Sequence, residues 1–276
     1  MKHNLVHYWA EHQKCWRELT RMPQSIGSFY SVCQLTCDKL LVTGGEVGGE
    51  VTANCWLFDL VNIRWTHMPS LFPARLYHRS IVLDQYVYVL GGIDTKDNAM
   101  ASVKCFDVVQ RQWSSLTDLP RAMYAPTVIS YGHKIYVFGG LDDDDKSLLC
   151  VHVYDSVLGQ WLILPDMPEV CGFNAAVSLS RFIYLVGGYT RSCLRFNPAT
   201  HQWTQLSRPR RRHGNAPAVV WKGGILVGGN SGGGREARSA AIEHYDTVKD
   251  QWTDWQAPLK EPLATHTMFS VILSGV

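Results

Sequence analysis

Six tryptophans recur along this chain at a nearly constant spacing. The intervals between them range from 42 to 49 residues, and the tryptophans are Trp16, Trp65, Trp113, Trp161, Trp203 and Trp252. A period of this length is typical of repeated supersecondary units, each of which buries its apolar face only against its neighbours. Because such units share faces, we treat residues 1–276 as a single domain.

Two further landmarks repeat in step with the tryptophan. A glycine pair ends an apolar run in five units, at positions 44–45, 91–92, 139–140, 187–188 and 228–229. In the same five units an aromatic residue followed by Asp or Asn lies seven positions before the tryptophan, as in Phe106-Asp107 before Trp113. The glycines predict backbone angles or close approaches that a β-carbon forbids, and the Asp predicts an Asx-type turn.

Each unit contains four short apolar runs of strand length. In the unit of Trp113 they are residues 77–83, 86–90, 103–108 and 113–116, and they are rich in Val, Ile, Tyr and Phe. No run is long enough for a helix. Turn residues join the first two runs as a hairpin, so each unit is predicted to be a four-stranded antiparallel sheet. Radial packing of these sheets predicts an all-β propeller with the tryptophans filling the gaps between blades.

This combination resembles the kelch repeat, and the resemblance covers nearly the whole chain. The residues that carry it are Tyr88-Val89-Leu90-Gly91-Gly92, Phe106-Asp107 and Trp113. WD40 propellers differ, because their Gly-His and Trp-Asp dipeptides do not recur here. One blade per tryptophan predicts a six-bladed kelch β-propeller.

The blade of Trp16 is predicted to close the ring with strands from both ends of the chain. Residues 5–9 and 15–19 supply its third and fourth strands and residues 266–273 its first, so the blade is shared by about 1–20 and 265–276. The chain stops at Val276, where the second strand would begin. We therefore expect this sequence to be a piece of a longer polypeptide.

Composition excludes several classes of function. The 26 Lys and Arg residues nearly balance the 24 Asp and Glu residues, so no overall field attracts nucleic acid or an anionic membrane. The N-terminus has no signal-peptide core, and no apolar stretch approaches transmembrane length. Eight cysteines without CxxC pairs predict reduced thiols. We expect a cytoplasmic protein without metal or cofactor.

The loops that follow the second and fourth strands of each blade are predicted to share one face, where recognition residues belong. The fourth blade has a shortened loop, which predicts a notch between the acidic run 142–145 and the basic run 208–213. The arginines of the basic run repel one another unless a ligand anion or a carboxylate of the chain meets them. Solvated loop charges are the alternative interpretation for both runs.

In kelch proteins, ligands bind just after the glycine pair and at the start of the innermost strand. The resemblance therefore implies contacts from Tyr30 and Glu46 and from their equivalents, and it places Ala125 and Gly214 at inner-strand starts as well. The full set of predicted partner-binding residues is Tyr30, Glu46, Tyr77, Phe173, Tyr189, Arg191, Arg210, Arg211, Arg212, His213 and Asn230. Family members that bind acidic degrons carry arginines at the inner-strand position, which this chain does not, so that ligand is not inherited.

The predicted function is a protein-interaction domain that is not an enzyme. The chain is similar to the kelch domain of BTB-kelch proteins, which implies substrate recognition for a cullin-RING ubiquitin ligase through a BTB domain absent from this chain. Binding to actin is the alternative partner. A propeller enzyme is a further alternative, because His78, His213 and His266 lie near inner-strand starts although no HxH or HExxH pair occurs.

Overall fold

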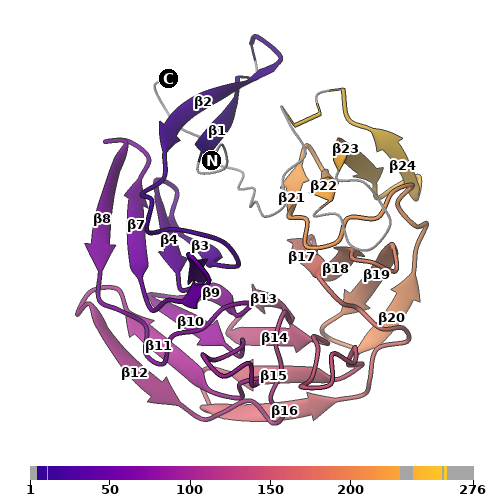
Figure 1. The fold of residues 1–276 in the computed structure, drawn as a ribbon. Coiled ribbons are helices and arrows are strands. Elements are labelled where there is room, and N and C mark those ends of the chain that lie inside the picture. The colour runs from indigo at the N-terminus through magenta and orange to yellow at the C-terminus, as the bar shows by residue number, and fades with distance from the viewer. Residues whose placement is uncertain (1–4, 11, 231–238, 257, 260–276) are drawn as a thin grey trace.

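Five four-stranded antiparallel sheets are arranged around a common centre in the computed structural model (Figure 1). The structure describes residues 5–10, 12–230, 239–256 and 258–259, and every regular element in these ranges is a β-strand. Within each blade the strands follow chain order from the centre outwards.

Blade one holds β3 (Ser31–Thr36), β4 (Lys39–Thr43), β7 (Cys55–Asp59) and β8 (Arg64–Met68). Blade two holds β9 (Arg79–Leu83), β10 (Tyr86–Leu90), β11 (Val103–Asp107) and β12 (Gln112–Leu116). Blade three holds β13 (Thr127–Tyr131), β14 (Lys134–Phe138), β15 (Val151–Asp155) and β16 (Gln160–Leu164). Blade four holds β17 (Asn174–Leu179), β18 (Phe182–Gly187), β19 (Ser192–Asn197) and β20 (Gln202–Gln205). Blade five holds β21 (Ala218–Trp221), β22 (Gly224–Asn230), β23 (Ser239–Asp246) and β24 (Gln251–Asp254).

The prediction of six blades is wrong, because the described residues form five four-stranded blades. The unit of Trp16 forms only a hairpin of β1 (Leu5–Ala10) and β2 (Cys15–Arg21), which lies between the first and fifth blades in Figure 1. Trp9 is opposite Trp16 across this hairpin, and no inner pair of strands is hydrogen-bonded to it within the described residues. The strand predicted at 266–273 lies outside those residues. A tryptophan marks only the outermost strand of a unit, so counting tryptophans does not count complete sheets.

Four of the six tryptophans fill the spaces between neighbouring blades, as predicted. Trp113 packs into an apolar cluster built from blades one and two, and Trp161, Trp203 and Trp252 do the same at the next three junctions. The indole of Trp113 also donates a hydrogen bond of 2.9 Å to the carbonyl oxygen of Pro69, in the segment that joins those two blades. The indoles of Trp161 and Trp252 donate in the same way to the carbonyl oxygens of Thr117 and Ser207, so blades two, three and five are each held to their predecessor by apolar burial and by a directed polar contact.

The remaining repeat landmarks form the predicted local structures. The carboxylate of Asp107 accepts hydrogen bonds of 2.8 Å from the amides of Val109 and Gln110, an Asx turn that recurs in the other blades. Gly139 has a φ of +55°, and a β-carbon there would lie 2.7 Å from the carbonyl oxygen of Cys171. The glycine is required both for its left-handed backbone and for the close approach of the next blade.

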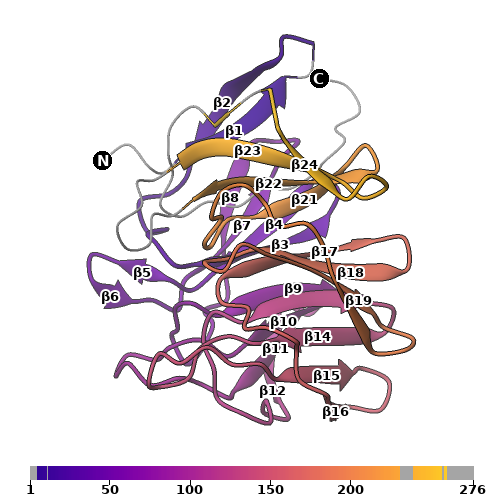
Figure 2. The ribbon, with the colours of Figure 1, turned by 90° about the vertical axis from the view of Figure 1, so that its right-hand side faces the viewer.

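The loops after the second and fourth strands lie on one face, which we call the loop face. Figure 2 shows this face at the left, where the small hairpin of β5 (Glu46–Val47) and β6 (Glu50–Val51) projects from blade one. Blade four has the shortest connection, with only residues 188–191 between β18 and β19. Among the described residues there is no helix of the length and apolarity that a membrane crossing requires.

Candidate functional site

Five aromatic rings from four blades meet on the loop face, and we call this group the aromatic platform. Its members are Phe29, Tyr77, Tyr124, Phe173 and Tyr189. The ring of Tyr77 is central, with centroid distances of 4.4 Å to Phe29, 6.0 Å to Tyr124 and 6.2 Å to Phe173. Tyr189 extends the group beyond Phe173 at 5.1 Å and is 38% exposed. Rigid aromatic area with polar tips is the surface composition that protein-binding sites favour.

The backbone holds these rings in place through one left-handed residue in each blade. Phe29, Tyr77, Ala125, Phe173 and Asn215 have φ values between +47° and +59°. Neighbouring members are hydrogen-bonded across the blade junctions, since the amides of Tyr77, Ala125 and Asn215 donate to the carbonyl oxygens of Phe29, Tyr77 and Phe173 respectively. Strained non-glycine residues of this kind cluster at binding sites, where the surrounding structure determines their angles.

Two of the predicted inner-strand positions are displaced by one residue. Phe29, and not Tyr30, is equivalent to Tyr77, and Asn215, and not Gly214, is equivalent to Phe173. Tyr30 is half-buried, and burial raises the pKa of its phenol to about 12. The repeat period carries the signal that finds Phe29, because positions 29, 77, 125 and 173 are each 48 residues apart.

Glu46 and Tyr189 lie next to the neighbours of Tyr77 in the platform. Glu46 exchanges backbone hydrogen bonds of 2.8 and 2.9 Å with Ser28, the residue before Phe29, and the ring of Tyr189 contacts that of Phe173. Burial raises the pKa of the Tyr77 phenol, and the nearby Tyr189 and Glu46 raise it further. Gly214 lies directly against the ring of Tyr189, so that any side chain at that position would overlap the ring. These three predicted site residues are therefore brought together, with Phe173 beside them.

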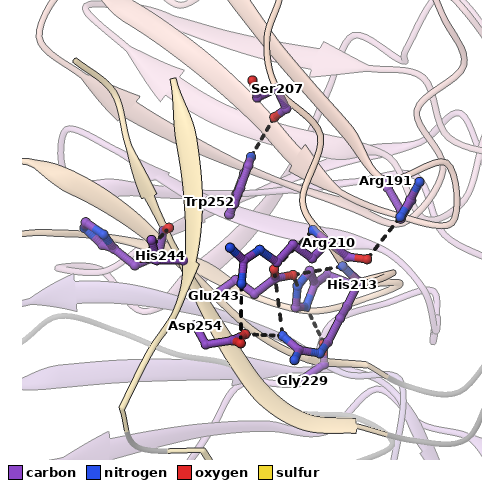
Figure 3. A network of polar contacts seen from close by, with 11 residues as sticks. Arg191, Ser207, Arg210, His213, Gly229, Glu243, His244, Trp252 and Asp254 are labelled. Atoms are coloured by element: carbon purple, nitrogen blue, oxygen red, sulfur yellow. Dashed lines mark hydrogen bonds and ion pairs between the residues drawn. The ribbon is translucent and has the colours of Figure 1, made fainter. Parts of the chain in front are cut away.

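The arginine loop, residues 208–212, is fixed by carboxylates of the chain itself (Figure 3). Glu243 on β23 accepts hydrogen bonds of 3.1 and 3.0 Å from the amides of Arg210 and Arg211. The guanidinium of Arg211 forms a hydrogen bond with Asp254, which raises the pKa of Arg211 and lowers that of Asp254. Asp254 also lies 3.6 Å from Arg210. Mutual repulsion among the arginines is thus offset within the protein.

His213 lies beneath this loop and is completely buried, as is its partner Glu243. The Nδ1 atom of His213 is 2.7 Å from the carbonyl oxygen of Gly229, and Nε2 is 2.6 Å from a carboxylate oxygen of Glu243. Both ring nitrogens therefore face oxygen atoms that can accept hydrogen bonds. Burial by itself raises the pKa of Glu243, but hydrogen bonds from His213 and from the Arg211 and Arg210 amides hold it below its ordinary value. His213 positions the loop and does not reach the surface.

The acidic run also has partners within the chain. Asp142 forms an ion pair of 2.9 Å with Arg121, and Asp144 forms one of 2.9 Å with Lys146. Asp143 accepts a hydrogen bond from the amide of Ala99, and Asp145 accepts one from the hydroxyl of Tyr124. The run therefore builds its own loop and positions one ring of the platform.

The remaining predicted site residues lie around this centre. Arg191 is exposed in the short loop of blade four, where its guanidinium donates to the carbonyl oxygen of Arg210. Arg212 is exposed on the arginine loop. Asn230 is the last residue of β22, and its side chain lies outside the described part of the structure. Sequence reasoning missed Phe29, Tyr124, Glu243 and Asp254, of which the two carboxylates carry no repeat signal.

The predicted histidines do not form a metal site within the described residues. His78 is buried and hydrogen-bonded through Nε2 to the hydroxyl of Thr43 at 2.9 Å, whereas His213 is engaged with Glu243. Burial lowers the pKa of His78 well below its ordinary value, and Arg75 and Arg79 lower it further. No group of three potential metal ligands occurs in this part of the chain. His266 lies outside the described residues.

Comparison with known proteins places these features in a wider context. The model of the KLHDC2/KLHL20/DRC7 Kelch-repeats domain matches residues 77–275. Kelch-like protein 24 of Homo sapiens is 34% identical over 90 residues, which are 33% of this chain and 14% of that protein. Kelch-like protein 21 of Danio rerio is 35% identical over 81 residues, which are 29% of this chain and 13% of that protein. The solved structure of YjhT superposes with a TM-score of 0.75 at 14% identity, over 87% of this chain and 86% of that one, and so shares the fold.

Proposed function

This chain belongs to the KLHDC2/KLHL20/DRC7 kelch-repeat family, and on that premise we propose that its loop face binds a segment of a partner protein. The aromatic platform is the centre of the proposed surface. The arginine loop, Arg191 and Asn230 form its edge over blades four and five. His213 contributes by holding the arginine loop to β23.

The aromatic platform is the observation that carries this proposal. Rings from separate blades converge on the loop face, where Tyr124 is buried, Tyr77 and Phe173 are half-buried against it, and Tyr189 is exposed. The left-handed residues and the hydrogen bonds between them fix the backbone beneath the rings. A partner therefore meets a preorganised surface, which reduces the ordering cost of binding.

A more specific proposal concerns the role of the propeller within the full-length protein. The kelch-like relatives are much longer than the segments that match this chain, which cover 14% and 13% of their length. We assign the propeller the role of substrate recognition in a BTB-kelch adaptor of a cullin-RING ubiquitin ligase. Co-purification of a cullin with the full-length gene product supports this role, and absence of cullin from that complex contradicts it.

The binding surface is tested by comparing two truncations of exposed side chains. Tyr189→Ala removes a ring from the platform, whereas Val248→Ala removes apolar area on the opposite face, where Val248 is 93% exposed. Quantitative affinity purification with mass spectrometry is expected to show partner recovery reduced about tenfold by Tyr189→Ala and unchanged by Val248→Ala. Equal recovery of the same partners by both variants contradicts a site on the loop face.

A further inference from the structure

We propose that the platform around Glu46, Tyr77 and Tyr189 receives a basic side chain, lysine or arginine, from the partner segment. This inference rests on the proposed function and adds the chemical class of the group that is bound. The remainder of the partner segment lies across the other rings towards the arginine loop.

Glu46 has a fixed backbone and an uncommitted side chain. Its amide donates to the carbonyl oxygen of Ser28 at 2.8 Å, and its carbonyl oxygen accepts from the amide of Ser28 at 2.9 Å. The carboxylate forms no ion pair with any other residue in the described ranges, and Glu46 is half-buried. A carboxylate held in this way needs a cationic partner when a bound ligand excludes water from it.

The aromatic rings beside Glu46 suit the same ligand. Tyr77 and Tyr189 have electron-rich rings. Glu46 is paired through its backbone with Ser28, and the next residue, Phe29, has its ring centroid 4.4 Å from that of Tyr77. The raised pKa of the Tyr77 phenol, which burial causes and Tyr189 and Glu46 increase, agrees with this placement. Lysine and arginine cations are attracted both to aromatic faces and to a carboxylate. The methylene stem of either side chain can also lie along apolar ring surface.

Charge elsewhere on the loop face favours this placement. Arginines are concentrated on the loops of blades four and five, where Arg208 is paired with Glu169 at 2.6 Å and Arg211 with Asp254. The corresponding loops of blades one to three carry most of the carboxylates, including Glu46, Asp94 and the run 142–145. A segment with a basic group therefore meets opposite charge over blade one and like charge over blade five.

A random linear peptide library, displayed on phage and selected on the purified chain, tests the inference. Selected sequences are expected to be enriched in lysine or arginine at one position. Anisotropy titration then compares a selected peptide with its version in which that residue is glutamine. Glu46→Gln is expected to weaken the basic peptide about tenfold and to leave the glutamine peptide unchanged.

Glu50→Gln is the matched control, because it removes the same charge from the same small hairpin at an exposed position. It should leave both affinities within about twofold. Glu46→Lys should shift the preference towards a peptide with glutamate at the selected position. The inference is overturned if Glu46→Gln and Glu50→Gln have equal effects, or if the selected peptides show no basic preference.

Failure of the inference is distinguishable from failure of the proposed function. If Tyr189→Ala weakens the selected peptides but their basic residues do not affect binding, the loop face binds partners and only the assigned chemistry is wrong. If the library yields no peptide whose binding Tyr189→Ala weakens, both proposals are contradicted.

Discussion

His213 and Glu243 form a completely buried hydrogen-bonded pair in which Nε2 of His213 lies 2.6 Å from Oε2 of Glu243. The same carboxylate oxygen accepts the amide of Arg211, so one acidic side chain connects the imidazole with the arginine loop. The pair therefore connects the interior of blade five with the arginine loop on the loop face.

Removal of one member of this pair should be strongly destabilising. His213→Ala leaves the carboxylate of Glu243 buried without its imidazole partner, and we expect a loss of about 3–5 kcal/mol in the free energy of unfolding, measured with denaturant. Arg208→Ala breaks the exposed ion pair with Glu169 and should cost less than about 1 kcal/mol. Similar losses for the two variants would show that the buried pair contributes no more to the free energy of unfolding than an exposed ion pair does.

Low pH should reduce the stability of the folded protein in part through protonation of Glu243. Its pKa is lowered in the folded state, so its contribution to stability is present above the unfolded value of about 4.3 and is lost as the pH falls through the folded value. The free energy of unfolding should therefore fall below about pH 4. Glu243→Gln should show a shallower decline over that range, although it is less stable at neutral pH. Parallel pH profiles of stability for the native protein and for Glu243→Gln would contradict a contribution of Glu243 to the acid sensitivity.

The tryptophan between blades one and two is expected to stabilise their junction. Trp113→Ala removes apolar surface from that cluster and a hydrogen bond to Pro69, and we expect a loss of about 3 kcal/mol. Val109→Ala in the same blade, at a position 77% exposed, should change the free energy by less than about 0.5 kcal/mol. A denaturant midpoint for Trp113→Ala within error of the native value is inconsistent with this packing.

Alanine substitutions at two glycines of blade three should distinguish the cost of a left-handed backbone from the cost of steric overlap. Gly139 and Gly132 have φ values of +55° and +58°, but a β-carbon at Gly139 meets the carbonyl oxygens of Cys171 and Leu148 whereas one at Gly132 meets nothing within 4 Å. Gly132→Ala should cost about 1 kcal/mol and Gly139→Ala at least about 2 kcal/mol, by thermal or denaturant unfolding. A smaller loss at Gly139 than at Gly132 would falsify the close approach.

Much of the fold could be predicted because its determinants are local and repeated. The Asp107 turn depends on amides two and three residues away, and the strand 86–90 agrees with the predicted bounds. The blade number could not be predicted in this way. Trp16 has the spacing of the other tryptophans, yet its unit is a hairpin in the described residues, because sheet completion depends on strands distant in sequence.

The candidate site likewise contains residues that the repeat period could locate and residues that it could not. The repeat period locates Tyr77 and Phe173 on the loop face at the start of the inner strands, since each blade repeats the same backbone path. The carboxylates that meet the arginines were not predictable, because Glu243 is 32 residues from Arg211 and shares no motif with it.

The sequence by itself determined the repeating unit, its turns and the tryptophans between blades, because each depends on residue type and short-range spacing. Only the tertiary structure decided how many sheets are complete and that His213 is buried. It also decided that Arg208, Arg210 and Arg211 have carboxylate partners, whereas Glu46 has no ion pair among the described residues. Charge pairing and burial depend on which distant segments come within a few ångströms, and blade packing sets those distances.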